Sequence, residues 1–293
     1  MSDTIAAIAT ALSPSAIGIL RLSGPDTKAV LDAVFFPLNG RPMSQQTPRT
    51  MVLGRVLDGE GRVLESALCV LFPGPDSYTG EDCAELHCHG SPVVLTEGLK
   101  LLLNHGARQA KGGEFTQRAF LNGRMDLMQA EAVVDVIDAE TAQAARNAAG
   151  QLDGALSRTV QAVYDTLMDV TSRFYAIVDY PDEDIEDLNR TQLLDALGRS
   201  EASLAALCEA IGALYPTGAE PQGELLTNAR QADAVRRALS CVKNAHASLQ
   251  FGMTPDVVLT DAEGALEALG ELSGKHIRED LVDTIFSRFC VGK

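Results

Sequence analysis

The stretch LDGALSRTVQAVYDTLMDVTSRFYAI, residues 152–177, determines the fold class of the larger part of this chain. Its apolar residues recur every three or four positions, which places them along one face of an α-helix. These positions are Leu152, Leu156, Val160, Val163, Leu167, Val170, Phe174 and Ile177. The spacing therefore predicts one long amphipathic helix, which Pro181 ends because proline cannot continue a helix.

Similar helical periodicity surrounds this stretch on both sides. It is present at 127–137 before the long helix, and at 191–212, 225–250, 260–273 and 277–289 after it. The segment GALYPTGAEPQGE at 212–224, with two prolines and three glycines, is the only good linker in the second half. We therefore expect residues 119–293 to form a helix bundle.

The first part of the chain has a different pattern. Apolar runs typical of strands occur at 16–22, 51–57 and 67–72, and candidate helices lie at 25–35 and 92–104. This predicts an α+β domain over residues 1–118. The segment FPGPDSYTGED at 72–82 contains two prolines and two glycines, so we expect an exposed, shaped loop there and regard it as a candidate site.

Composition excludes several functional classes. A net charge of -16 disfavours a protein that grips a phosphate backbone unaided. Six scattered cysteines without a C-x-x-C pair fit reduced thiols, and the N-terminus has neither a signal peptide nor a membrane span, so we expect a soluble cytoplasmic protein. No G-x-x-x-x-G-K-[ST] motif occurs, which argues against a nucleotide-phosphate loop.

Residues 83–89 are the first candidate site. Cys83, Glu85, His87 and His89 would share one face of a strand and are all possible metal ligands. Same-face side chains on a strand lie about 7 Å apart, so a metal ion would need further ligands from elsewhere. We predict no metal site and interpret this face as a polar surface, either hydrogen-bonded or able to recognise a small molecule. Glu85 is the sharpest clue, because a carboxylate on an inner strand needs a donor.

Two arginines and the C-terminal tail are further candidates. Arg21 ends an apolar strand, and Arg124 follows a turn. Each is most simply a surface charge, but together they would form a fork for a carboxylate or phosphate. The tail is either frayed or anchored by Ile285, Phe286 and Phe289, which would hold Cys290 and Lys293 in a pocket.

Several longer stretches resemble one family, the bacterial tRNA-modification GTPases called MnmE or TrmE. The matching stretches are AIGILRLSG (16–24), FPGPDSYTGEDCAELHCHGSPVV (72–94), GGEFTQRAFLNGRMDLMQAEAVVDVIDAET (112–141), DYPDED (179–184), LTNARQ (226–231) and the terminal FCVGK. The resemblance implies a homodimer built through an N-terminal domain similar to tetrahydrofolate-binding domains. It also implies a helical domain into which a GTPase domain is inserted.

The resemblance also implies a function. Family members act with a flavoprotein, MnmG (GidA), in forming carboxymethylaminomethyl-uridine at the wobble position of tRNA, and a tetrahydrofolate derivative (5-formyl or 5,10-methylene) supplies the one-carbon unit. The implied folate contacts are Arg21, Glu85, Arg124 and Lys293, and the implied reactive cysteine is Cys290. The acidic charge suggests that tRNA is held mainly by the partner.

One departure from the family is large. The GTPase domain, with its GTP, Mg²⁺ and K⁺, would lie at about 212–224, where this chain has only the linker. We therefore expect a folate-binding, dimerising scaffold that neither binds nor hydrolyses GTP. Two alternatives stay open: a stand-alone folate-dependent one-carbon transferase that works without GTP, and a structural subunit with a vestigial pocket.

Overall fold

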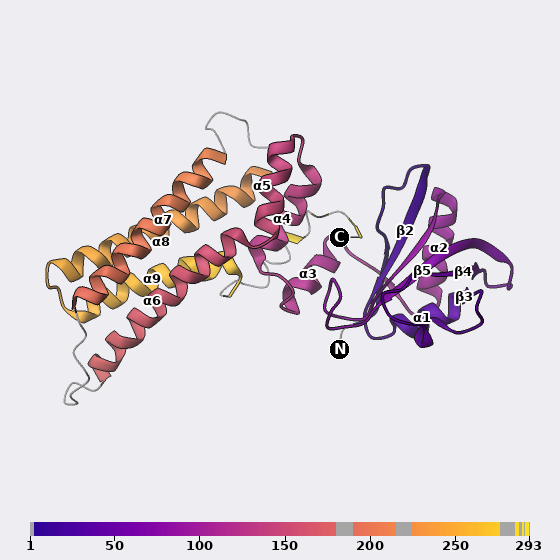
Figure 1. Cartoon of the computed structure of the whole chain (residues 1–293), viewed down its shortest axis with the longest axis horizontal. Coiled ribbons are helices and arrows are strands. Elements are labelled where there is room, and N and C mark those ends of the chain that lie inside the picture. The colour runs from indigo at the N-terminus through magenta and orange to yellow at the C-terminus, as the bar shows by residue number, and fades with distance from the viewer. Residues whose placement is uncertain are drawn as a thin grey trace. The chain divides into compact units, whose positions relative to one another are not determined.

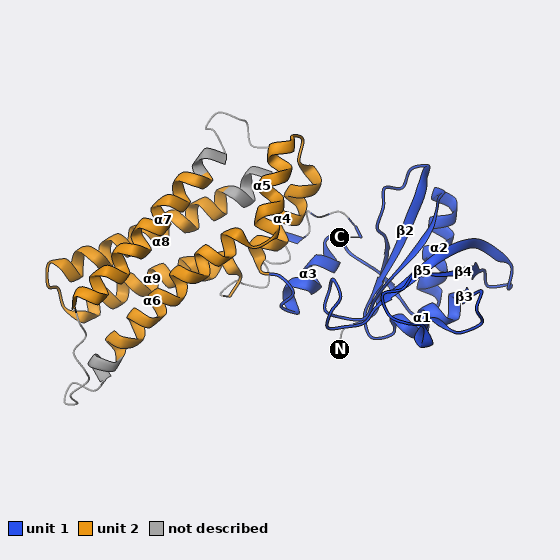
Figure 2. Cartoon of the chain, in the orientation of Figure 1, with its two compact units in different colours: residues 1–125, 279–293 blue, residues 126–278 orange. Residues whose placement is uncertain are grey.

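The computed structural model describes residues 3–179, 190–214, 224–275, 285–286, 289 and 291–292. The chain divides into two compact units (Figure 2). The first comprises residues 1–125 together with 279–293, and the second comprises residues 126–278.

The first unit is built on a mixed sheet. Among the described residues it has seven strands in the order β3-β4-β5-β6-β2-β1-β7, all antiparallel to their neighbours except the parallel pair β1–β7. The strands are β1 (Ile5–Ile8), β2 (Ser15–Ser23), β3 (Phe35–Pro37), β4 (Val52–Leu57), β5 (Val63–Phe72), β6 (Cys83–Gly90) and β7 (Arg108–Gln109).

Helices α1 (Thr27–Val34) and α2 (Pro92–Asn104) pack beside the sheet, and α3 (Glu114–Leu121) follows β7 (Figure 1). The Ser91 side chain caps α2 by accepting from the Val94 amide, with proline in the first turn. Leu20 of β2 approaches α2 at Gly98 so closely that a Cβ there would lie 2.7 Å from a Leu20 methyl. A larger residue at position 98 would therefore require the Leu20 methyl group to shift.

The second unit is entirely helical among its described residues. It consists of α4 (Leu127–Asp138), α5 (Ala142–Leu152), α6 (Ala155–Asp179), α7 (Arg190–Leu214), α8 (Glu224–Gln250) and α9 (Pro255–Ser273). Helices α6 to α9 run alongside one another and share one hydrophobic core (Figure 1). The apolar positions of α6 supply much of it, including Val160, Leu167 and Phe174. The expected fold class, an α+β domain followed by a helical domain, is confirmed.

Two details of the sequence prediction need correction. The long helix begins at Ala155 rather than Leu152, because Gly154 adopts a left-handed conformation (φ +80°) and Leu152 ends α5. The short strands β1, β3 and β7 and helix α5 were not predicted. The expected linker at 212–224 and helix at 277–289 lie mostly outside the described residues.

The boundary between the units also differs from the expected division at 118/119. The first unit extends to residue 125 and includes residues 279–293. The physical reason is that α3 continues past this point with Ala119 fully buried, and that Phe286 packs on Phe120 with ring centroids 6.2 Å apart. Within the described part of the chain, no helix is long and apolar enough to cross a membrane.

Candidate functional site

The centre of the candidate site is an ion pair between two neighbouring strands. Arg21 of β2 lies opposite Glu85 of β6 in the antiparallel register. The Arg21 Nε and Nη2 groups donate to Glu85 Oε1 at 3.0 and 2.9 Å, while Glu85 Oε2 is 3.1 Å from His87 Nε2. Both members of the pair are partly buried. The strand carboxylate therefore has the donor that the sequence indicated it needs.

Aromatic rings border the Arg21 guanidinium. Its Cζ lies 5.7 Å from the ring centroid of Tyr78 and 5.8 Å from that of Phe115, within the range of a cation–π contact. Tyr78 comes from the loop 73–82, and its hydroxyl is 2.8 Å from Thr116 Oγ1. Burial raises the pKa of Tyr78, and this effect outweighs the lowering by Thr116 and Arg21. The phenol is therefore neutral at pH 7 and can donate a hydrogen bond.

The C-terminal tail reaches the same guanidinium. Val291 forms an antiparallel bridge with Gly112, and Arg21 Nη1 donates to the Gly292 carbonyl at 3.1 Å. Gly292 has φ +98°, and a Cβ there would lie 2.6 Å from the Ile8 carbonyl oxygen, so only glycine fits.

Phe286 and Phe289 anchor the tail. Both side chains are buried, and their ring centroids are 5.2 Å apart. The alternative of a frayed tail is wrong for the described residues. Cys290 and Lys293, the two other tail residues of the predicted site, lie outside the described part of the chain.

Arg124 lies against a different part of the loop 73–82. Its Nη1 is 3.8 Å from Asp76 Oδ1, and a Cβ on Gly80 would lie 3.4 Å from Arg124 Cγ. Among the described contacts, Arg21 and Arg124 share no hydrogen-bond or ion-pair partner. The structure therefore brings Arg21, Glu85 and the tail together, and it places Arg124 against the loop 73–82, which also carries Tyr78.

The four possible metal ligands of β6 have separate partners. Cys83 Sγ is 3.0 Å from the Thr79 hydroxyl, and His89 Nδ1 is 3.0 Å from Glu65. Only Glu85 and His87 contact each other. In the described ranges no group of three or more His, Cys, Asp or Glu side chains could hold a metal ion.

Three elements of the site were not predicted as such. They are the Tyr78 ring, the Glu85–His87 hydrogen bond and the Gly292 carbonyl. The Pro- and Gly-rich loop was a signal for the first, although it did not single out Tyr78. The contact of the Gly292 carbonyl could not be predicted, because every residue has a backbone carbonyl and the sequence does not distinguish one from another.

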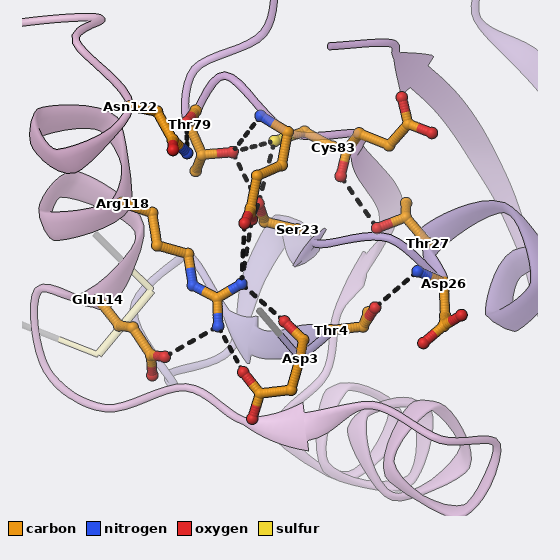
Figure 3. Close-up of polar contacts among 12 residues, drawn as sticks. Asp3, Thr4, Ser23, Asp26, Thr27, Thr79, Cys83, Glu114, Arg118 and Asn122 are labelled. Atoms are coloured by element: carbon orange, nitrogen blue, oxygen red, sulfur yellow. Dashed lines mark hydrogen bonds and ion pairs between the residues drawn. The ribbon is translucent and has the colours of Figure 1, made fainter. Parts of the chain in front are cut away.

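A cluster of ion pairs centred on Arg118 contacts the loop 73–82 at Glu81 (Figure 3). In that view Arg118 extends from α3 towards Asp3 and Glu114. Its guanidinium also contacts Glu81 of the loop, with Nη1 3.0 Å from Oε2. The loop that borders the site is therefore attached to a network of charged side chains, Asp3, Glu81, Glu114 and Arg118, which no sequence motif predicted.

Family models match almost the whole chain. One described as the N-terminus of the GTP-binding protein TrmE matches residues 4–124, and one described as the MnmE helical domain matches residues 127–213 and 199–290.

Several curated proteins named tRNA modification GTPase MnmE are similar to this chain. The one from Clostridioides difficile is 43% identical over 188 residues, covering 64% of this chain and 41% of that protein. The one from Opitutus terrae is 43% identical over 220 residues, covering 74% and 47% respectively. In these two matches the chain spans less than half the length of its relative.

A third relative, from Symbiobacterium thermophilum, is 29% identical over 454 positions, covering 99% of both chains. Since this chain has 293 residues, a long internal stretch of that relative has no counterpart here.

Proposed function

Because the chain belongs to the MnmE (TrmE) family, which is involved in tRNA modification, we propose that it is the folate-binding, dimerising scaffold of a wobble-uridine modification system. The observation that carries this proposal is the connected group of Arg21, Glu85 and Gly292, which joins two strands and the tail by hydrogen bonds. In this system the partner is a flavoprotein of the MnmG (GidA) type, and the product is carboxymethylaminomethyl-uridine.

The donors and acceptors of the site fit a reduced folate. Arg21 has five N–H groups, of which three are used by Glu85 and Gly292, so two are left for a ligand carboxylate or carbonyl. Glu85 Oε2 has one acceptor position left beside His87, and release of His87 would free a second. A pterin ring offers paired N–H donors to such a carboxylate. Arg124, Lys293 and Cys290 complete the proposed site, with Cys290 as the candidate reactive group.

We further propose that this chain does not use GTP. Helix α7 ends at Leu214 and α8 begins at Glu224, so only residues 215–223 connect them. A GTPase domain needs far more residues than this connection contains. The sequence also lacks the Gly-rich Lys-Ser/Thr loop that holds nucleotide phosphates and Mg²⁺.

The open face of the sheet supports a homodimer. Leu53 of β4 lies opposite Leu68 of β5, which in turn lies opposite His87 of β6. The two leucines are 51% and 39% exposed, so apolar surface continues on the same sheet face as the site. A second copy of this chain is the occupant we propose, and tRNA is held mainly by the flavoprotein because the chain is strongly acidic.

Calorimetric titration with 5-formyltetrahydrofolate tests the folate site. We expect the parent chain to bind, and Arg21→Ala and Glu85→Ala each to weaken binding by about tenfold or more, since each removes a charged hydrogen-bond partner. Arg62→Ala is the matched control, because Arg62 is exposed and pairs only with Asp58 and Glu60 among the described contacts. An unchanged affinity in both site variants would show that folate does not bind at the proposed site. A folded parent chain that does not bind folate would contradict the proposed function.

A further inference from the structure

We propose that Arg118 is a positioning residue for the ligand site: it fixes the loop 73–82, which carries Tyr78, onto helix α3. This inference rests on the proposed folate site. Arg118 does not belong to that site, because its described side-chain partners are Asp3, Glu81 and Glu114 and include neither Arg21 nor Glu85.

Arg118 is the centre of a dense ionic network (Figure 3). Nη1 donates to the Asp3 carbonyl at 2.7 Å and to Glu81 Oε2 at 3.0 Å, while Nη2 donates to Asp3 Oδ1 at 2.7 Å and to Glu114 Oε1 at 3.1 Å. The residue is only 9% exposed. Burial by itself lowers the pKa of Arg118, but Glu81, Glu114 and Asp3 raise it above its ordinary value. The guanidinium is therefore charged and held in one geometry.

Glu81 is the point where this network meets the loop. Its side chain is largely buried, and Oε2 accepts from Arg118 and from the Ser23 hydroxyl at 2.7 Å. Arg118 is its only cationic partner among the described contacts. Without Arg118, a buried carboxylate would be left with a single neutral side-chain donor, which is costly. The carboxylate would then turn towards water and carry the loop with it.

Helix α3 and the residue that caps its C-terminus, Asn122, hold the loop at two more points. Thr116 Oγ1 is 2.8 Å from the Tyr78 hydroxyl, and Asn122 Nδ2 donates to the Thr79 carbonyl at 2.7 Å. Tyr78, Thr79 and Glu81 are thus attached to α3 and its C-cap residue, and the Tyr78 ring lies against the Arg21 guanidinium. A shift of the loop at Glu81 would move the Tyr78 ring away from the site.

Arg108 provides a matched control. It donates to Asp3 and Glu114, the same carboxylates that Arg118 contacts, but it makes no described contact with Glu81 or the loop. It is more exposed, with 41% of its side chain accessible. Arg108→Met therefore removes one charge from the same network without releasing the loop.

The first experiment compares affinities for 5-formyltetrahydrofolate in Arg118→Met and Arg108→Met. We expect about a tenfold loss for Arg118→Met, less than about twofold for Arg108→Met, and an intermediate loss for Arg118→Lys, which retains the charge but not the fork. Tyr78→Ala should weaken binding in the parent and have little further effect in Arg118→Met, because coupled residues are not additive. Equal losses for the two arginines, or additive effects with Tyr78→Ala, would overturn the proposal.

The second experiment needs no ligand. Amide hydrogen exchange of residues 73–82 should be about tenfold faster in Arg118→Met than in Arg108→Met. Glu81→Gln, which keeps the side-chain size, should show the same increase if Arg118→Met does not fold. Equal exchange in the loop would overturn the proposal even if folate binds. If the parent chain does not bind folate, the proposed function is contradicted. The exchange rates of Arg118→Met and Arg108→Met then still test whether Arg118 fixes the loop.

Discussion

At the scale of single residues, the buried carboxylates Glu114 and Glu131 show how burial and hydrogen-bond donors change a pKa in opposite directions. Burial by itself raises the pKa of Glu114, but hydrogen bonds from Arg108, the Lys111 amide and Arg118 lower it below its ordinary value. Burial also raises the pKa of Glu131, and there Arg230 and Gln231 do not compensate. The two differ first in burial, since Glu131 is the more deeply buried, and Asp135 raises its pKa further. They also differ in donors: Glu114 faces two arginines and an amide, whereas Glu131 faces one arginine and a neutral side chain.

The lowered pKa of Glu114 leads to a prediction about stability. Its contribution is complete above its ordinary value of 4.5 and is lost as the pH falls through its lower folded-state value. We expect Glu114→Gln to lower the free energy of unfolding by about 1–3 kcal/mol at pH 7, with a smaller difference at pH 3. Urea unfolding at both pH values measures this.

The control for this substitution is Glu97→Gln, since Glu97 is an exposed carboxylate paired with Lys100 on α2. Exposed pairs of this kind contribute little, so its effect should be below about 1 kcal/mol at either pH. A loss in Glu114→Gln that stays the same at pH 3 would contradict the assigned pKa direction.

The residues of the site could be predicted only in part. Arg21 and Glu85 stood out because each is a charge beside an apolar strand sequence. Their pairing could not be predicted, because it depends on the register between strands 64 positions apart in the chain. Tyr78 could not be distinguished from its neighbours in the loop, since its role depends on where the loop lies over the sheet.

At the scale of elements, helix periodicity was the most reliable signal. Helices α6 to α9 were expected within a few residues of their observed bounds, because long apolar faces repeat many times. The break between α5 and α6 was hidden, since Leu152 continues the apolar spacing across Gly154. Strand β1, with the sequence IAAI, was not expected because alanine gives little strand signal.

The open face of β4 and β5 gives a prediction at this scale. Leu53→Asp places a charge on the apolar surface that we propose a second copy covers, so we expect the dimer to dissociate at micromolar concentration. Light scattering measures the molar mass. The control is Val93→Asp on α2, where the side chain is 70% exposed. A dimer that persists in Leu53→Asp, or a parent that is a monomer, would contradict the proposed interface.

At the scale of the whole molecule, packing between residues far apart in the sequence determines to which unit the C-terminal segment belongs, which periodicity cannot predict. The last residues of the chain belong to the first unit, where Phe286 and Phe289 are buried and Gly292 contacts Arg21. No local pattern predicts which unit a tail joins. The division into an α+β and a helical part was predictable, because the repeat of apolar residues changes along the chain.

We propose that the first unit binds a folate without the help of a GTPase domain. Titration of the parent chain with 5-formyltetrahydrofolate, with and without GTP and Mg²⁺, tests it most directly. We predict saturable binding with about one folate per chain and the same affinity in both conditions, because no group of the site depends on a nucleotide. Absence of binding, or an affinity that changes when GTP is added, would show that the first unit has no such independent folate site.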